Sequence, residues 1–251
     1  MIDLSGQRIF IAGGSRGIGR ATALMAARAG ADVAFCYVAD ESAARETADG
    51  IARAGRKAFF VRGDVADEMS IVPAVDRAAE ALGGLSAVAV SAGIFEPGPL
   101  GEMTLEFWNR VMAINLTGTF LTLRAAVPHL RENAGGSIVI FTSTAGQRGS
   151  DIYSAYAASK GGQIIFMRSM AKELARDRIR VNCVAPAWTD TDMARPSFDA
   201  IGRDKIVRGF PLGRIGMPED AAGAAVYLMS DLAQFVTGMT LTVDGGRDMR
   251  G

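Results

Sequence analysis

The stretch IAGGSRGIGRA (residues 11–21) joins a buried strand pattern to an Ala-rich helical pattern. Gly13, Gly17 and Gly19 permit a tight turn, a close approach of the backbone to phosphate and close packing of a helix on a strand. The first turn of the following helix would present unpaired N–H groups to a pyrophosphate. Because this stretch follows the first strand of the chain, it predicts a dinucleotide-binding turn within an α/β fold.

The alternation of strand and helix patterns continues to the end of the chain. Apolar, β-rich runs predict strands at 8–13, 32–38, 57–65, 85–93, 136–143, 179–186 and 239–246. Amphipathic runs predict helices at 17–30, 41–55, 67–82, 104–127, 154–176 and 218–229. No linker or repeat divides residues 1–251, so we expect a single domain whose parallel sheet is covered on both faces. Ligands of such sheets bind beyond the carboxyl ends of the strands.

Composition argues against several classes of function. Lys and Arg together (27) balance Asp and Glu (27), so no charge excess favours nucleic acid or an anionic membrane. The first residues lack the features of a signal peptide, and no apolar run approaches a membrane span. Cys36 and Cys183 lie in apolar segments and predict buried thiols in a reducing cytoplasm. The single histidine, His129, and the lack of a His/Cys cluster argue against a Ser-His-Asp triad and a metal site.

The segment YSAYAASK (153–160) places two tyrosines on the helical face that carries Lys160. A free tyrosine has a pKa of about 10, and an ammonium one turn away would favour the phenolate. Tyr156 lies one turn from Lys160, whereas Tyr153 lies two turns away, roughly 10 Å along the helix axis. Tyr156 is therefore the better candidate for a general acid/base. An ordinary stripe of core and surface residues has the same spacing, so this pattern does not decide the question alone.

Two other polar residues occupy unusual positions. Ser143 ends the strand predicted at 136–143, where its hydroxyl would hydrogen-bond a substrate carbonyl and the resulting oxyanion. Asn115 lies inside the apolar run 104–127, and burying it without partners is costly. It is either a satisfied core residue or one that holds a water or a kinked backbone for proton transfer.

These residues together resemble the short-chain dehydrogenase/reductase family, specifically its compact single-domain branch, which includes 3-oxoacyl carrier-protein reductases. The resemblance covers nearly the whole chain. In order and spacing, Asn115, Ser143, Tyr156 and Lys160 match the catalytic tetrad of the family. Further family-like segments are GGSRGIG (13–19), GDV (63–65), VNCVAP (181–186), PLGRIGMPED (211–220) and VTGMTLTVDGG (236–246).

The resemblance implies a Rossmann-type, doubly wound sheet of seven parallel strands, and reversible hydride transfer between NAD(P)(H) and an alcohol/carbonyl pair. It implies Tyr156 as acid/base and Ser143 as the group that orients the carbonyl oxygen. Lys160 would bind the nicotinamide ribose and lower the tyrosine pKa, and Asn115 would support a water-linked proton relay. Members are usually tetramers, so a homotetramer is expected. The implied cofactor contacts are Gly13, Ser15, Arg16, Gly17, Ile18, Gly19, Tyr37, Asp64, Val65, Ser91, Ala92, Gly93, Tyr156, Lys160, Pro186, Thr189 and Thr191.

The choice of cofactor depends on a few positions. Asp40 and Glu41 lie at the distance of a ribose-binding acid, but they would equally start the second helix. Tyr37, at the position of the family's acid, is neutral and would not repel a 2′-phosphate. Arg16 would pair with that phosphate, or would be a solvated loop residue. The sequence favours NADP(H), with NAD(H) as the alternative.

Two segments depart from the family pattern. Val90-Ser91-Ala92-Gly93 stands where the family has Asn-Asn-Ala-Gly, and Pro186-Ala187 where it has Pro-Gly. Polar contacts to the sheet or ribose are therefore in doubt, although the hydroxyl of Ser91 would keep one of them.

Substrate specificity is expected near 187–210, which interrupts the strand–helix rhythm and predicts a mobile lid. Phe95, Gln147, Tyr153 and Trp188 are candidate pocket residues, each of which would otherwise only pack. The substrate would be a partly apolar alcohol or carbonyl compound, and the activity that of a 3-oxoacyl carrier-protein reductase, a sugar or polyol dehydrogenase or a small-ketone reductase. The alternative is a non-catalytic NAD(P)-binding regulator, against which the intact tetrad argues.

Overall fold

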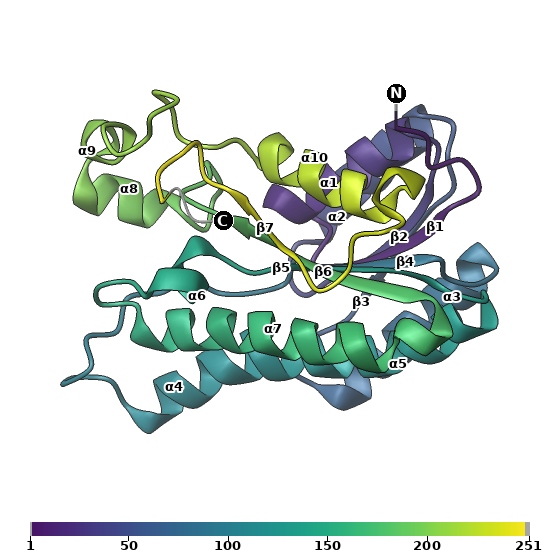
Figure 1. The fold of residues 1–251 in the computed structure, drawn as a ribbon, viewed down its shortest axis with the longest axis horizontal. Helices are drawn as coiled ribbons and strands as arrows, with labels where there is room; N and C mark the ends of the chain where they lie inside the picture. The colour runs from purple at the N-terminus through teal and green to yellow at the C-terminus, as the bar shows by residue number, and fades with distance from the viewer. Residues whose placement is uncertain (1, 249–251) are drawn as a thin grey trace.

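Seven parallel strands form one sheet in the computed structural model, which describes residues 2–248 (Figure 1). The strand order is β3-β2-β1-β4-β5-β6-β7, so the chain starts in the middle of the sheet and winds outward in both directions. The predicted α/β, doubly wound architecture is confirmed. The strands are β1 Arg8–Ala12, β2 Asp32–Tyr37, β3 Ala58–Arg62, β4 Ala87–Val90, β5 Gly136–Phe141, β6 Ile179–Pro186 and β7 Thr240–Val243.

Helices cover both faces of the sheet, α1, α2 and α10 on one face and α3, α5 and α7 on the other (Figure 1). The helices are α1 Gly17–Arg28, α2 Glu41–Arg53, α3 Glu68–Leu82, α4 Leu105–Met112, α5 Gly118–Glu132, α6 Thr144–Arg148, α7 Ser154–Glu173, α8 Arg195–Ile201, α9 Arg203–Val207 and α10 Pro218–Met229. The short helices α6, α8 and α9 gather on one side of the molecule (Figure 1).

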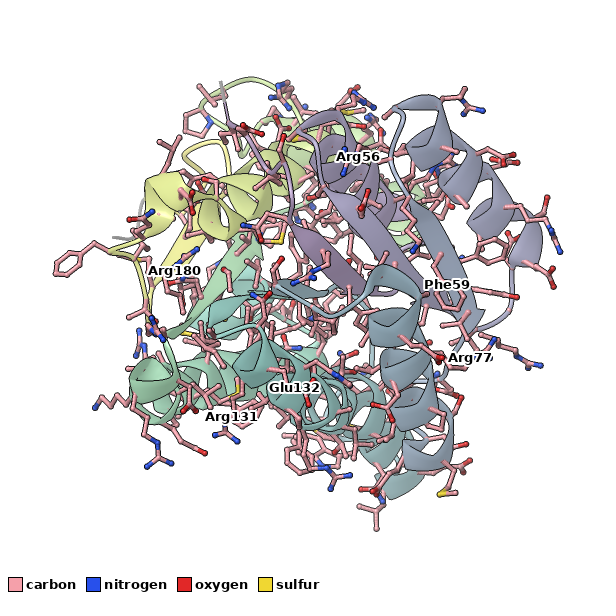
Figure 2. The ribbon with its side chains drawn as sticks, turned by 90° about the vertical axis from the view of Figure 1, so that its right-hand side faces the viewer. Arg56, Phe59, Arg77, Arg131, Glu132 and Arg180 are labelled. Carbon is pink, nitrogen blue, oxygen red and sulfur yellow. The ribbon has the colours of Figure 1, made fainter. Side chains whose placement is uncertain are left out.

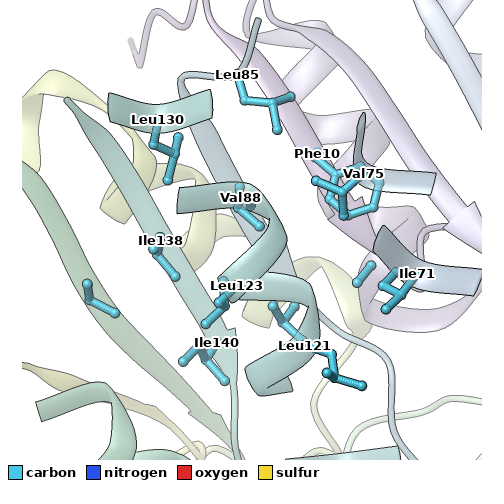
Figure 3. Close-up of a cluster of buried hydrophobic side chains, with 14 of the residues drawn as sticks. Phe10, Ile71, Val75, Leu85, Val88, Leu121, Leu123, Leu130, Ile138 and Ile140 are labelled. Carbon is cyan, nitrogen blue, oxygen red and sulfur yellow. The ribbon is translucent and has the colours of Figure 1, made fainter. Parts of the chain in front are cut away.

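Alternate residues of each strand supply two separate cores. In β1, Phe10 packs with α3 and α5, whereas Ile9 and Ile11 pack with α1, α2 and α10. Figure 3 shows the first of these cores, where Val88 and Ile138 from neighbouring strands meet helical leucines and isoleucines. Because both faces of the sheet are buried, the strands are nearly continuous apolar runs. For this reason they could be predicted from the sequence.

Ion pairs gather at the end of the molecule opposite α6, α8 and α9 (Figure 2). There Arg131 pairs with Asp177 at 2.8 Å, and Arg56 pairs with Asp32 at 2.8 Å. All four side chains are partly exposed, so each pair contributes little to stability.

The helix predicted over 104–127 is longer and less regular than expected. It runs as α4, a π-helical turn Ala113–Thr117 and α5, which continues through Pro128 to Glu132. The whole stretch of 28 residues has a mean hydropathy of 1.2 in its most apolar window, which is enough for a membrane span by composition alone. The expectation that no apolar run approaches a span is therefore wrong, but half of that window is buried in the structure, as in core helices of soluble proteins.

Two segments near the predicted site also differ from expectation. The stretch 187–210 is not an irregular loop, because it contains α8 and α9, which pack around Phe198, Ile206 and Phe210. The strand expected to reach 143 ends at Phe141, so Ser143 is instead the N-cap of α6. The Ser143 hydroxyl accepts a hydrogen bond from the backbone N–H of Ala145 at 3.1 Å.

Candidate active site

In the turn between β1 and α1, backbone atoms pack directly against one another. Gly13 and Gly17 adopt positive φ angles of 81° and 55°, which side chains with a Cβ rarely adopt. A Cβ on Gly19 would lie 2.0 Å from the carbonyl oxygen of Gly13, and one on Gly13 would lie 2.9 Å from the amide nitrogen of Ala92. No side chain caps the start of α1, so its first N–H groups stay available. This geometry fits the pyrophosphate of a dinucleotide.

The predicted cofactor residues come together at the carboxyl ends of five strands. The backbone N–H groups of Ser91 and Ala92 both donate to the carbonyl of Ala12 at 2.9 Å, which ties the end of β4 to the glycine turn. The Ser91 hydroxyl lies beside Gly19, so this serine keeps a polar atom at the turn. The others are Ser15 and Arg16 in the turn, Ile18 at the start of α1, Tyr37 at the end of β2, Asp64 and Val65 after β3, Gly93 after β4, Pro186 at the end of β6, and Thr189 and Thr191 after β6.

Lys160 is buried and Tyr156 is half-buried on one face of α7, next to Ser143. Burial raises the pKa of Tyr156 to about 12, and the hydrogen bond with Ser143 opposes that rise. Burial lowers the pKa of Lys160 to about 8. Its Nζ donates to the carbonyl of Phe141 at 2.8 Å and lies 5.8 Å from the centroid of the Tyr156 ring. For the side chains of this chain alone, the predicted lowering of the tyrosine pKa is therefore wrong, because burial dominates and only the hydrogen bond with Ser143 opposes it.

Asn115 occupies the π-helical turn and is completely buried. Its side chain accepts from the backbone N–H of Ile94 at 2.8 Å and donates to the carbonyl of Ile94 at 3.0 Å and to the Ser159 hydroxyl at 3.1 Å. A Cβ on Gly93 would lie 3.1 Å from the Asn115 amide oxygen and 3.6 Å from Lys160 Nζ. The side chains of Asn115 and Lys160 therefore both end beside Gly93. The three hydrogen bonds satisfy the Asn115 side chain with protein groups, as the first of the two interpretations expects, and its part in proton transfer stays a prediction.

The sequence reasoning missed Gln163, a fully buried residue of α7. Its amide Nε2 donates to the carbonyl of Asn115 at 2.8 Å and to the Thr119 hydroxyl at 2.7 Å, while that hydroxyl donates to the same carbonyl at 2.7 Å. Gln163 therefore fills the acceptor capacity of the carbonyl that the π-helical turn exposes. Its position three residues after Lys160, on the same helical face as Tyr156, was the signal available in the sequence.

A cavity opens above Tyr156 and Ser143 and continues to α6 and the start of 187–210. Its walls include Phe95, Trp188 and Arg148. The ring of Phe95 meets Tyr156 edge-on at 4.8 Å and Trp188 edge-on at 5.5 Å between centroids. The tyrosine hydroxyl thus faces a partly apolar space closed by aromatic rings.

The four candidate substrate residues fall into two pairs. Phe95 and Trp188 line the cavity. Tyr153 lies behind Phe95, stacked on it at 4.2 Å between centroids, with its hydroxyl 3.0 Å from that of Ser197 in α8. Gln147 points to β7, where its Nε2 donates to the Thr242 hydroxyl at 3.2 Å. Tyr153 therefore supports the aromatic wall and tethers α8, and Gln147 joins α6 to the sheet edge.

Comparison with known proteins agrees with this geometry. A family model described as enoyl-(acyl carrier protein) reductase matches residues 12–248. The chain belongs to the short-chain dehydrogenase/reductase family. The cis-4-hydroxycyclohexanecarboxylate dehydrogenase of Sinomonas cyclohexanicum is 40% identical over 241 residues, which cover 94% of each chain. A 3-oxoacyl-[acyl-carrier-protein] reductase of Chlamydia muridarum is 36% identical over 239 residues, covering 94% of this chain and 95% of that one.

The fold is shared with solved members of this family. The structure of a putative short-chain alcohol dehydrogenase from Sinorhizobium meliloti 1021 superposes with a TM-score of 0.93 at 34% identity, covering 98% of this chain and 97% of that one. As a short-chain dehydrogenase/reductase, the protein is an NAD(P)-dependent oxidoreductase. The resemblance inferred from the tetrad and the glycine turn is confirmed.

Proposed function

We propose that the protein is an NADP(H)-preferring carbonyl reductase or alcohol dehydrogenase in which Tyr156 is the general acid/base. The observation that carries this proposal is the convergence of the Tyr156 and Ser143 hydroxyls in one cavity, with Lys160 buried beside them. The bound nicotinamide supplies or accepts the hydride.

Side chains of the protein supply the proton. With a pKa of about 12, the Tyr156 phenol is neutral at working pH and donates its proton to the alkoxide that forms during reduction. The Ser143 hydroxyl donates to the same oxygen and holds it in place. The charge of Lys160, present below about pH 8, stabilises the phenolate left behind.

The end of β2 supports NADP(H) over NAD(H). Asp40 caps α2 by accepting from the N–H of Ala43 at 2.9 Å, and Glu41 pairs with Arg45, so both acids are engaged in starting that helix. The last residue of β2 is the neutral Tyr37, which hydrogen-bonds the Glu41 carboxylate, so no acid of β2 itself would repel a 2′-phosphate. Arg16 lies exposed in the turn, where its guanidinium would pair with that phosphate.

The substrate we propose is an alcohol/ketone pair with a substantial apolar body. The aromatic cavity supports this choice, as does similarity to a dehydrogenase of a hydroxycyclohexane acid. An acyl carrier-protein thioester and a sugar or polyol are the alternatives. Residues 187–210 act as a lid on this cavity, tethered to α7 through Ser197 and Tyr153.

We further propose a cytoplasmic homotetramer. Exposed apolar side chains support self-association on two faces: Leu232, Phe235 and Met239 beside the edge strand β7, and Phe120 and Ile165 on α5 and α7. Sedimentation analysis tests this assembly.

The decisive experiment is turnover of a ketone panel with NADPH and with NADH. We expect Tyr156→Phe to lower kcat at least about 100-fold, because proton donation is lost, while cofactor binding by fluorescence titration stays within about twofold. Tyr153→Phe is the matched control, since it removes a hydroxyl one turn away that bonds Ser197. Activity lost in Tyr153→Phe but kept in Tyr156→Phe would overturn the assignment, and cofactor binding without any turnover would favour the regulator.

A further inference from the structure

Among the described residues 2–248 that line the cavity, Arg148 carries the only charged side chain. It ends α6, the helix that Ser143 caps. With a rise of about 1.5 Å per residue, the five steps from Ser143 to Arg148 span roughly 7 Å of helix axis. A small molecule whose carbonyl oxygen contacts Ser143 therefore reaches Arg148 with its opposite end.

A carboxylate already lies against this guanidinium. Asp248 Oδ1 is 2.9 Å from Arg148 Nε, while its other oxygen, Oδ2, is buried with no partner among residues 2–248. The backbone N–H of Asp248 donates to Asp244 at 2.8 Å, and this turn aims Asp248 at α6. The ion pair involves one edge of the guanidinium, whose side chain remains 31% exposed. Asp248 therefore occupies the edge formed by Nε and one Nη, which another carboxylate can use only when Asp248 leaves.

We propose that Arg148 binds a carboxylate of the substrate, and that Asp248 occupies this position until the substrate displaces it. The inference rests on the proposed function and names its substrate class, an oxo or hydroxy acid whose carboxylate lies across an apolar body from the reacting carbon. A guanidinium matches a carboxylate in a planar, two-point contact. A phosphate dianion fits less well, because no second cation lines the described cavity.

The test compares a keto acid with an uncharged analogue of the same shape. The probes are 4-oxocyclohexanecarboxylate and its carboxamide, reduced with NADPH by the full chain. We expect wild type to prefer the acid in kcat/KM, and Arg148→Gln to lower the acid-to-amide ratio about tenfold or more, since a charged contact is lost. Asp248→Asn removes the competing carboxylate, so KM for the acid should fall about threefold or more.

The control variant is Arg131→Gln, which removes an arginine of a surface ion pair at the opposite end of the molecule (Figure 2). It should keep the wild-type ratio. Isothermal titration of the NADP⁺ complexes with 4-oxocyclohexanecarboxylate repeats the comparison independently of turnover, because the oxidised cofactor has no hydride to give to a ketone.

An equal acid-to-amide ratio, or equal affinity of the NADP⁺ complexes for the keto acid, in wild type and Arg148→Gln would overturn the inference. Turnover of the amide in both proteins would meanwhile leave the proposed function standing. If no member of the ketone panel is reduced, the proposed function itself is wrong.

Discussion

Two regions of the site are built in opposite ways. The turn between β1 and α1 depends on the absence of side chains at Gly13 and Gly19, which lets backbone segments pack directly against one another. The region around Asn115 works because polar atoms are present, so that buried side chains complete one another's hydrogen bonds. The glycine turn should therefore fail when a methyl group is added, and the polar region when a donor is removed.

The largest effect is expected from Gly19→Ala. The new Cβ would lie 2.0 Å from the Gly13 carbonyl oxygen, and backbone cannot yield as a flexible side chain does. We expect a loss of about 3 kcal/mol in unfolding free energy and at least about 100-fold weaker cofactor binding, measured by denaturant titration and fluorescence. The matched control is Gly223→Ala in α10, where a Cβ meets nothing within 4 Å and should stabilise slightly. Similar behaviour of the two variants would contradict this account.

The next effect is expected at Lys160, whose burial opposes folding. Because its pKa falls from 10.5 to about 8 on folding, the unfolded chain binds more protons between these pH values, and wild-type stability gains from this group as pH rises. Below pH 8 the whole penalty remains, so Lys160→Met should be more stable by about 2 kcal/mol, after loss of the bond to Phe141.

That advantage should shrink as pH rises from 8 towards 10.5. Measuring both proteins by denaturant titration at each pH cancels the contributions of Tyr156 and the buried cysteines, which they share. If the stability difference between Lys160→Met and wild type stays constant between pH 7 and 10, Lys160 does not titrate in this range and the account is wrong.

A smaller effect is expected from Gln163→Leu. The carbonyl of Asn115 loses one of its two donors, so the π-helical turn can shift and carry Asn115 away from Lys160. We expect kcat to fall about tenfold with KM little changed. Stability should change by less than about 1 kcal/mol, because the buried Gln163 Oε1, unpartnered among the described residues, disappears too.

The control for this variant is Thr122→Val. Its hydroxyl donates at 2.7 Å to the carbonyl of Gly118 and is as buried as Gln163, yet it does not reach Asn115. An equal loss of kcat in both variants would mean that Gln163 acts only by supporting the core.

The smallest effect is expected from Arg16→Gln. Its guanidinium would contact only the 2′-phosphate, so the preference for NADPH over NADH in kcat/KM should fall about fivefold to tenfold. Arg20→Gln is the control, since Arg20 lies one turn further along α1 and pairs with Glu46 at 3.3 Å. An unchanged ratio in Arg16→Gln would favour the solvated-loop alternative for this arginine.

The sequence predicted what depends on local pattern. The strand expected at 179–186 is observed as Ile179–Pro186, because most of its residues are apolar and several are β-branched. Tyr156 and Lys160 share a helical face, as their spacing requires. Glycines at 13, 17 and 19 located the turn, because close backbone contact and positive φ leave few other residues suitable.

What the sequence could not predict depends on contacts between distant segments. The π-helical turn is held from α7, by Gln163 and Ser159, and no local pattern over 113–117 reveals those partners. Gln147 was expected in the pocket, but its direction is decided by Thr242, which lies 95 residues further along the chain. The direction of the Tyr156 pKa shift depended on how far packing withdraws its hydroxyl from water, which only the folded structure reveals.

The π-helical turn also makes the site sensitive to the length of the chain. A π turn closes its hydrogen bond over one residue more than an α turn, so it amounts to a one-residue insertion within Leu105–Glu132. Deleting one residue there would restore a regular helix, in which the Asn115 carbonyl would no longer be left free for Gln163 and Thr119. Such a deletion would give the helix better hydrogen bonds while removing these contacts from the site. Insertions and deletions, which loops readily tolerate, should therefore be harmful in this helix even where every substitution nearby is mild.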